Sequence, residues 1–198
     1  KLTGPKKVIT KHKTFDVGDE AVMHSLSNET WISKERSKAI RMIEKQSSNK
    51  SLILMDDGLQ NNSIYQDLKI CIFDGSMGLG NSRILPSGPL RESLISGLKK
   101  TNIAIIIGED KNNIQQTILK NRENVNVYNG VFVPDKNTIQ ELSNKKLYAF
   151  AGIGIPDKFY ELLKSFNLNL IKTRSFPDHY KYKEYDLQKL LKESKELK

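Results

Sequence analysis

Two short runs of apolar residues dominate the first half of the chain. Leu52–Met55 and Ile70–Phe73 contain apolar residues only, and an acidic residue directly follows each run. An unbroken apolar run of this length is typical of a parallel strand that is covered on both faces. The stretch 102–107, which reads NIAIII, has the same character. The pattern therefore predicts three buried strands of one parallel sheet.

Helical segments separate these strands. Ser37 is a suitable N-cap for one of them, because its hydroxyl can accept a hydrogen bond from a free backbone N–H group. The predicted helices span Ala21–Leu26, Ser37–Gln46, Leu94–Lys100, Ile114–Lys120 and Tyr185–Leu197. Strands that alternate with helices indicate a doubly wound α/β fold on a mostly parallel sheet.

A change of pattern at residues 124–146 indicates a domain boundary. The stretch 124–134 (NVNVYNGVFVP) alternates apolar with polar positions and contains Asn-Gly, which is typical of a connecting strand or a hairpin. From Lys146 a new strand–helix–strand pattern begins, with YAFAGIG, PDKFYELLKSF and NLIKTRSF. We therefore predict an α/β domain at 1–123, a β linker at 124–146 and part of a second α/β domain at 147–198.

Composition limits the partners and the cellular compartment expected for this fold. The 198 residues carry a net charge of +9, so phosphates, nucleic acid or anionic lipid headgroups are the favoured partners. The single cysteine, Cys71, excludes a disulfide framework and indicates a reducing cytoplasm. The sequence shows no apolar run long enough to span a bilayer and no secretory signal pattern.

The acidic residues that follow the first two predicted strands are candidates for chemistry. Ligands of open α/β sheets bind at the carboxyl ends of the strands, where Asp56, Asp57 and Asp74 are expected. A carboxylate pair such as Asp56 and Asp57 can hold Mg²⁺ beside phosphate oxygens. The same residues also suit a polar turn that closes a strand.

Two turns that contain glycine allow two interpretations as well. In Gly18-Asp19-Glu20 the acids can act in chemistry, or can stabilise the first turn of the following helix. The sequence GIGIP at 152–156 either frees a helix N-terminus for an anion or forms a tight structural turn. It does not match the GxGxxG spacing of a dinucleotide site, because residue 157 is aspartate.

A histidine and two arginines complete the candidates. His179 lies in the loop FPDHY, and imidazole exchanges protons near neutral pH. Asp178 can orient this ring or cap the following turn, whereas the other two histidines are expected at the surface. Arg83 and Arg91 flank the loop PSGPL, where guanidinium groups suit phosphate or remain solvated loop charges.

Taken in order, these motifs resemble those of the tetraacyldisaccharide 4′-kinases of lipid A biosynthesis. MDDGLQ, DLKICIFDG, GNSRILPSGPLRE, FAGIGIP and FPDHY follow the family's order and spacing from about Val17 to Leu191. The resemblance implies a P-loop-kinase-like α/β fold, with helices on both faces of a mostly parallel sheet. It also implies transfer of the γ-phosphate of ATP, with Mg²⁺, to the 4′-hydroxyl of tetraacyldisaccharide 1-phosphate at the cytoplasmic face of the inner membrane of Gram-negative bacteria.

The same resemblance assigns roles to individual residues. Asp19 matches the family's general base and His179 the histidine that pairs with it, and a base is needed because a sugar hydroxyl is a weak nucleophile. The residues implied around Mg²⁺ and the nucleotide are Glu20, Asp56, Asp57 and Gln60, of which Glu20, Asp56 and Asp57 are the expected metal ligands. Arg36 and Arg91 are implied near anionic groups of the reactants, beside Arg83.

Some positions depart from the family pattern. Leu59 and Asn61 replace an aromatic residue and a histidine, Tyr180 replaces the second histidine of FPDHH, and Ala21 stands where proline is common. The family's glycine-rich phosphate loop is not found, since GPKK at Gly4 does not match GxxxxGK[ST]. We therefore expect an internal fragment or a truncated product that is inactive by itself.

An alternative is a basic remnant without catalytic function that binds anionic lipid or nucleic acid. The net charge would attract it to an anionic membrane surface. Nucleic acid is not expected as the partner, because the sequence shows neither a DNA- or RNA-binding motif nor a basic–aromatic stripe. The expected partners are thus the lipid A disaccharide precursor and an anionic membrane, with no obligate protein partner indicated.

Overall fold

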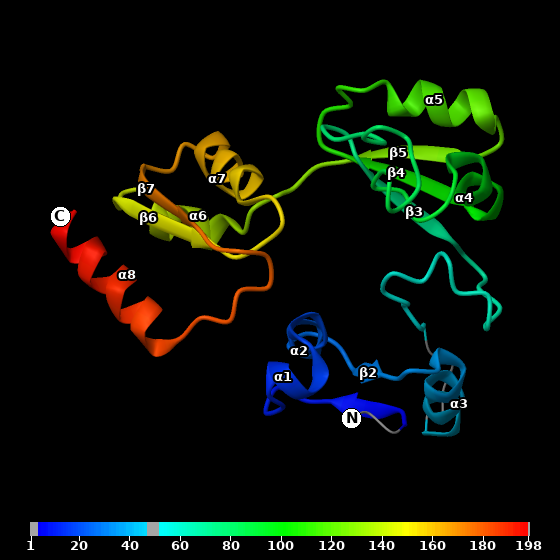
Figure 1. The fold of residues 1–198 in the computed structure, drawn as a ribbon, viewed down its shortest axis with the longest axis horizontal. Coiled ribbons are helices and arrows are strands. Elements are labelled where there is room, and N and C mark those ends of the chain that lie inside the picture. The colour runs from blue at the N-terminus through cyan, green and yellow to red at the C-terminus, as the bar shows by residue number, and fades with distance from the viewer. Residues whose placement is uncertain (1–3, 47–51, 198) are drawn as a thin grey trace. The chain divides into compact units, whose positions relative to one another are not determined.

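The computed structural model describes residues 4–46 and 52–197 (Figure 1). It divides into two compact units, of which unit 1 ends at Val131 and unit 2 begins at Phe132. The predicted linker region 124–146 contains a strand of unit 1 and a helix of unit 2.

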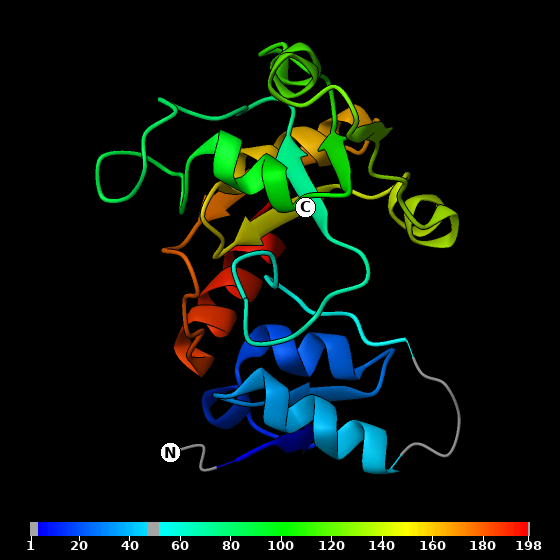
Figure 2. The same ribbon diagram turned by 90° about the vertical axis from the view of Figure 1, so that its right-hand side faces the viewer.

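Unit 1 begins with a pair of antiparallel strands and their helices, drawn in blue in Figure 2. Strands β1 (Lys6–Val8) and β2 (Thr30–Ile32) pair with each other, helices α1 (Thr14–Val17) and α2 (Asp19–Ser25) connect them, and α3 (Arg36–Gln46) follows. Gly18 separates α1 from α2 with a φ of 93°, which glycine adopts at little cost because it has no Cβ atom. This turn makes Asp19 the first residue of α2.

Three parallel strands form the main sheet of unit 1, in the order β3 (Ile70–Asp74), β4 (Ile103–Ile107) and β5 (Asn126–Gly130). Helices α4 (Leu94–Lys100) and α5 (Ile114–Asn121) connect them. The segment of β5, which the sequence suggested as a connecting strand or hairpin, is thus the third strand of this sheet. The parallel sheet itself is confirmed.

One face of this sheet carries the core of unit 1. Phe73 and Ile106 are register partners on this face, and they pack with Leu98 of α4 and Ile118 of α5. On the opposite face of β3, Ile72 is 66% exposed. The core thus lies between the sheet and the two helices, and the loop that carries Arg91 connects β3 to α4.

The predicted strand at Leu52–Met55 is wrong for the described residues. The structure assigns no strand there, and the side chains of Leu52 and Leu54 are 86% and 84% exposed. A strand needs a neighbour to pair with its backbone N–H and C=O groups, and no described strand pairs with these residues. The segment leads directly into the Asp56-Asp57 turn.

Unit 2 is a second, smaller α/β unit. Its elements are α6 (Lys136–Leu142), β6 (Leu147–Ala151), α7 (Pro156–Ser165), β7 (Leu170–Ser175) and α8 (Glu184–Glu196). Strands β6 and β7 are parallel, and the buried Tyr160 of α7 donates a hydrogen bond of 2.7 Å to the carbonyl of Arg174. Across both units, none of the described helices is both long and apolar enough to cross a membrane.

Candidate functional site

The Asp56-Asp57-Gly58 sequence forms a turn, and hydrogen bonds from residues that follow it in the chain stabilise this turn. Asp57 has a φ of 49°, a left-handed conformation that aspartate tolerates better than most residues. The side-chain amide of Gln66 donates to the carbonyls of Gly58 at 3.0 Å and of Asn61 at 2.9 Å. The Oδ1 atom of Asn61 accepts from the backbone and hydroxyl of Ser63. Asn61, which replaces the family histidine, thus shapes this turn.

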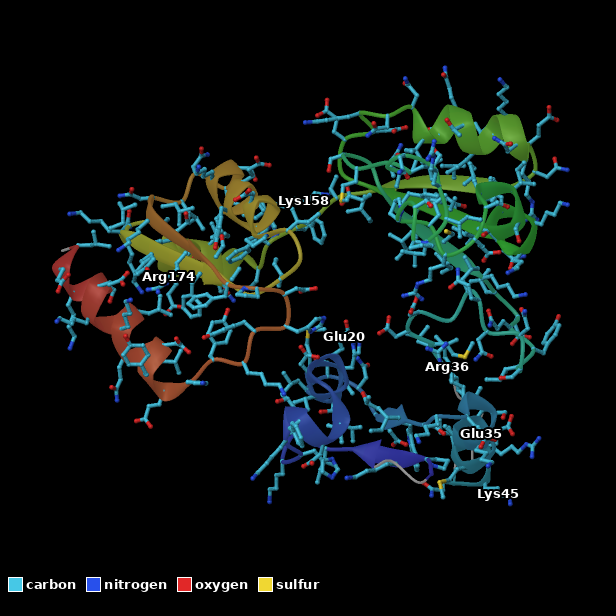
Figure 3. The ribbon with its side chains drawn as sticks, in the orientation of Figure 1. Glu20, Glu35, Arg36, Lys45, Lys158 and Arg174 are labelled. Atoms are coloured by element: carbon cyan, nitrogen blue, oxygen red, sulfur yellow. The ribbon has the colours of Figure 1, made fainter. Side chains whose placement is uncertain are left out.

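Arg36 and Arg91, which are distant in the sequence, also contact this turn. Arg36, at the start of α3 in Figure 3, donates to the carbonyl of Asp57 at 3.0 Å and to that of Asp56 at 2.8 Å. The guanidinium of Arg91 forms an ion pair with the carboxylate of Asp57. The side chains of Asp56 and Asp57 nevertheless remain 67% and 56% exposed. Two guanidinium groups therefore fix this turn while its carboxylates stay accessible.

The loop before Arg91 is ordered by its own contacts. Asn81 donates to the carbonyl of Ser87 at 2.7 Å, and the N–H of Leu90 donates to the carbonyl of Arg83 at 3.1 Å. A Cβ atom on Gly88 would lie 2.1 Å from the Oδ1 atom of Asn81, so only glycine fits. This close packing places Arg91 against the turn, whereas the side chain of Arg83 is exposed in the loop.

Glu92 links the same turn to helix α4. Its carboxylate accepts from Lys100 at 2.8 and 3.1 Å, from Ser96 at 2.7 Å and from Gln60 at 3.2 Å. The hydrogen bond from the Lys100 ammonium, followed by that from Ser96, lowers the pKa of Glu92 below its usual value. Glu92 was not among the candidates from sequence. The only local signal was a spacing of four residues, which places Ser96 and Lys100 on one side of α4 and Glu92 just before the N-cap Ser93.

Helix α2 reaches the turn through a histidine. The Nε2 atom of His24 lies 3.8 Å from the Oδ2 atom of Asp56. At the start of the same helix, the Oδ1 atom of Asp19 accepts from the N–H of Glu20 at 3.1 Å. His24 is partly exposed, as expected, but its position next to Asp56 was not predicted. Residues of α2, of α3 and of the loop that ends at Arg91 therefore all contact the Asp56-Asp57 turn.

Asp74, at the end of β3, has a local structural contact. Its Oδ1 atom accepts from the N–H and hydroxyl of Ser76 at 3.0 and 2.7 Å, and from the N–H of Met77 at 3.0 Å. These bonds are those of an aspartate that closes a turn after a strand. The structure thus gives Asp74 a part in shaping the loop after β3.

His179 lies in unit 2, in the loop between β7 and α8. Its φ is 51°, its side chain is 62% exposed, and its Nε2 atom lies 4.0 Å from a carboxylate oxygen of Asp178. The backbone N–H of His179 donates to the carbonyl of Gly152 at 3.1 Å. A Cβ atom on Gly154 would lie 3.7 Å from the carboxylate of Asp178. A negative charge beside the GIGIP turn favours its interpretation as a structural turn over an anion site.

The donor set of unit 1 suits a partly hydrated cation. Within residues 4–46 and 52–197, no group of three or more His, Cys, Asp and Glu side chains is arranged to hold a metal ion. Asp56 and Asp57 supply two exposed carboxylates. Mg²⁺ binds proteins through one or two carboxylates and keeps waters and phosphate oxygens as its other ligands. The pair therefore fits Mg²⁺ that arrives with a phosphate ligand.

The described residues have a mixed α/β architecture with parallel sheets, which is the predicted P-loop-kinase-like fold class. The fold is similar to that of LpxK from Aquifex aeolicus, described as its "apo" form in complex with ATP. The TM-score is 0.65 and the sequence identity 22%, over 93% of this chain and 61% of the other. The expected fold class is confirmed by this likeness.

The particular family follows from the sequence comparisons. The model of the LpxK family, described as tetraacyldisaccharide-1-P 4'-kinase, matches residues 1–198, so the chain belongs to that family. A tetraacyldisaccharide 4'-kinase from Rhodospirillum centenum is 32% identical over 96% of this chain and 56% of its own length. One from Paramagnetospirillum magneticum is 36% identical over 96% of this chain and 58% of its own length. The chain thus spans a little over half the length of these relatives.

Proposed function

We propose that the whole protein to which these residues belong transfers the γ-phosphate of ATP to the 4′-hydroxyl of tetraacyldisaccharide 1-phosphate, in lipid A biosynthesis. The family match over residues 1–198 is the observation that carries this proposal. The contacts of unit 1 support it, because residues with family-assigned roles meet there. Arg36, Asp56, Asp57 and Arg91 are joined by hydrogen bonds or an ion pair, and Gln60 is held beside them by Glu92.

The proposed reaction needs one proton transfer. The 4′-hydroxyl oxygen forms a bond to the γ-phosphorus, the bond from that phosphorus to the bridging oxygen breaks, and ADP leaves. The hydroxyl proton passes to the carboxylate of Asp19, which serves as general base. His179 is the proposed partner that stabilises Asp19 in this task. Asp19 belongs to unit 1 and His179 to unit 2.

Asp56 and Asp57 would hold Mg²⁺, with Glu20 as the third proposed ligand. When bound, the ion would neutralise charge that develops on the phosphate oxygens. Arg36 and Arg91 keep the two carboxylates in place through the turn, and Gln60 and Arg83 are proposed to contact the nucleotide and anionic groups. Arg36 is proposed to lie near anionic groups of the reactants as well, and it also stabilises the turn, since its guanidinium donates to two backbone carbonyls.

The substrate is a lipid, so we also propose that the protein works at the cytoplasmic face of the inner membrane. The net charge of +9 supports this site, because anionic headgroups attract basic proteins. Sedimentation with vesicles tests it: the 198-residue chain should pellet with vesicles that contain phosphatidylglycerol and stay in solution with phosphatidylcholine. Equal sedimentation with both would contradict it.

The kinase proposal is tested by transfer of ³²P from [γ-³²P]ATP to purified tetraacyldisaccharide 1-phosphate. The protein from the whole reading frame should transfer label, and Asp19→Ala and Asp57→Ala should each reduce kcat by about 100-fold or more, the upper part of the range for a lost base or electrostatic group. Asp67→Ala is the matched control, because Asp67 is an exposed acid outside the site. It should leave kcat unchanged.

The 198-residue chain alone is predicted to transfer no label, because it has no GxxxxGK[ST] sequence to cradle the phosphates. Measurable turnover by this chain would overturn that prediction. Failure of the whole protein to transfer label from ATP would overturn the kinase proposal itself.

A further inference from the structure

Hydrogen bonds anchor both ends of the loop that carries His179. The partners in these bonds have no role assigned in the proposed reaction. At its start, the N–H of Phe176 donates to the carbonyl of Ala151 at 2.8 Å, and the N–H of His179 donates to the next carbonyl, that of Gly152, at 3.1 Å. Ala151 is the last residue of β6, and Gly152 directly follows it. The loop therefore leaves β7 still bound to the neighbouring strand.

At its other end, the loop is bound to helix α8 through Asp186. The Oδ2 atom of Asp186 accepts from the hydroxyl of Tyr180 at 3.1 Å and from the N–H of Lys183 at 2.9 Å. Tyr180 directly follows His179 in the chain. The hydrogen bond to Asp186 also raises the pKa of Tyr180, so its hydroxyl keeps the proton that it donates.

Aromatic rings fill the space between these two anchors. The ring of Phe176 lies 4.8 Å from that of Tyr180 and 5.1 Å from that of Tyr182, measured between centroids, and the two tyrosine rings are 5.3 Å apart. Such distances are those of favourable aromatic pairs. A Cβ atom on Gly152 would lie 2.9 Å from the Tyr182 hydroxyl and 3.1 Å from the Tyr180 Cβ atom, so the cluster packs directly on the end of β6.

This packing helps to hold the backbone conformation of His179, together with the hydrogen bond of 3.1 Å that its N–H donates to the Oδ1 atom of Asp178. A φ of 51° is uncommon for a residue other than glycine and persists only where the surroundings hold it. We infer that Tyr180 and Asp186 are positioning residues for His179: they hold its backbone and so set the direction of the imidazole. The inference rests on the proposed function, in which His179 assists the general base.

The chain permits a direct test, because it contains only three histidines. Histidine labelled with ¹³C in the ring gives one signal each for His12, His24 and His179 in the NMR spectrum of the 198-residue chain, and His179→Gln identifies the third. Tyr180→Phe retains the ring and removes the hydroxyl. It should shift the His179 signal and speed hydrogen exchange of the His179 N–H. Asp186→Ala should do the same, while the other two signals stay in place.

Glu184→Ala is the matched control, since Glu184 is an exposed acid in the same first turn of α8 that accepts a hydrogen bond from Gln188 of the same helix at 3.4 Å. It should leave the His179 signal unchanged. The inference is overturned if the His179 signal of Tyr180→Phe coincides with that of the wild type. It is equally overturned if all three histidine signals move together, or if Glu184→Ala moves the His179 signal as far as Asp186→Ala.

Phosphate transfer by the whole protein separates this inference from the proposed function. Tyr180→Phe should lower kcat by about tenfold, within the loss that a displaced group causes, and leave the KM for ATP unchanged. A shifted His179 signal with unchanged kcat would uphold the positioning by Tyr180 and Asp186. It would overturn the catalytic role proposed for His179.

Discussion

The ion pair between Glu92 and Lys100 should contribute measurably to the stability of unit 1, unlike the exposed pair of Lys7 and Glu29. Both pairs have short N–O distances, 2.8 and 2.7 Å. The side chains of Lys100 and Glu92 are 28% and 19% exposed, against 49% and 54% for Lys7 and Glu29. Water therefore screens the second pair much more strongly than the first.

The magnitude follows from the contacts of Glu92. A hydrogen bond to a charged group contributes about 1.5–3 kcal/mol when well shielded. Partial exposure reduces this value, so we expect a coupling free energy of about 1–2 kcal/mol between Glu92 and Lys100. For Lys7 and Glu29 we expect no measurable coupling.

A double-mutant cycle measures this coupling. Glu92→Ala, Lys100→Ala and the double variant are compared by native-state hydrogen exchange of the amides of β4, the central strand of unit 1. Exchange at named amides is preferable to a global melt, because a chain of two units need not unfold in one step. The same cycle on Lys7 and Glu29 is the control. Equal couplings for the two pairs, or a coupling below about 0.5 kcal/mol for Glu92 and Lys100, would show that the Glu92–Lys100 pair is no more stabilising than an exposed one.

Three further predictions concern the core and unit 2. Ile118→Ala should destabilise unit 1 by about 2–5 kcal/mol, measured by hydrogen exchange of β4 amides, because a side chain with no exposed surface leaves a cavity. Gly152→Ala should shift the His179 signal and lower the Tm of unit 2, since the new Cβ atom would lie 3.2 Å from the Pro177 carbonyl. Hydrogen bonds from Lys172 and then Tyr148 lower the pKa of Glu193 from 4.5 to about 2. Glu193 should therefore stabilise unit 2 fully above about pH 4.5, and this advantage over Glu193→Gln should fall as the pH decreases toward 2. Hydrogen exchange of α8 amides across this pH range measures the difference, and a constant difference would contradict the assignment.

Elements with strong local signals could be predicted from the sequence. Helix α4 has the predicted bounds, Leu94–Lys100, and the Ser93 hydroxyl caps it by accepting from the N–H of Ser96 at 3.2 Å. The strand predicted at 102–107 is β4, Ile103–Ile107. Helix caps and apolar periodicity depend on residues only a few positions apart, so the local sequence is enough to predict these elements.

Elements that depend on distant partners could not be predicted in the same way. The apolar run Leu52–Met55 resembles a strand, but it forms one only where another strand pairs with it. The elements α1 and β2 were not predicted, because four and three residues carry too little periodicity, and α6 was not predicted either. The alternating pattern of β5 suggested a connecting strand or a hairpin, whereas its parallel pairing with β4 makes it a strand of the main sheet.

The amino-acid sequence is sufficient to identify the family and the residue types available for its chemistry, because ordered motifs such as MDDGLQ and FPDHY are properties of the chain. How those residues are held depends on the folded arrangement. Arg36 meets Asp56 across 20 positions, Arg91 meets Asp57 across 34, and Glu92 meets Gln60 across 32. Contacts between residues so far apart in the sequence depend on how the sheet and its helices pack. No local propensity specifies which loop contacts which other loop.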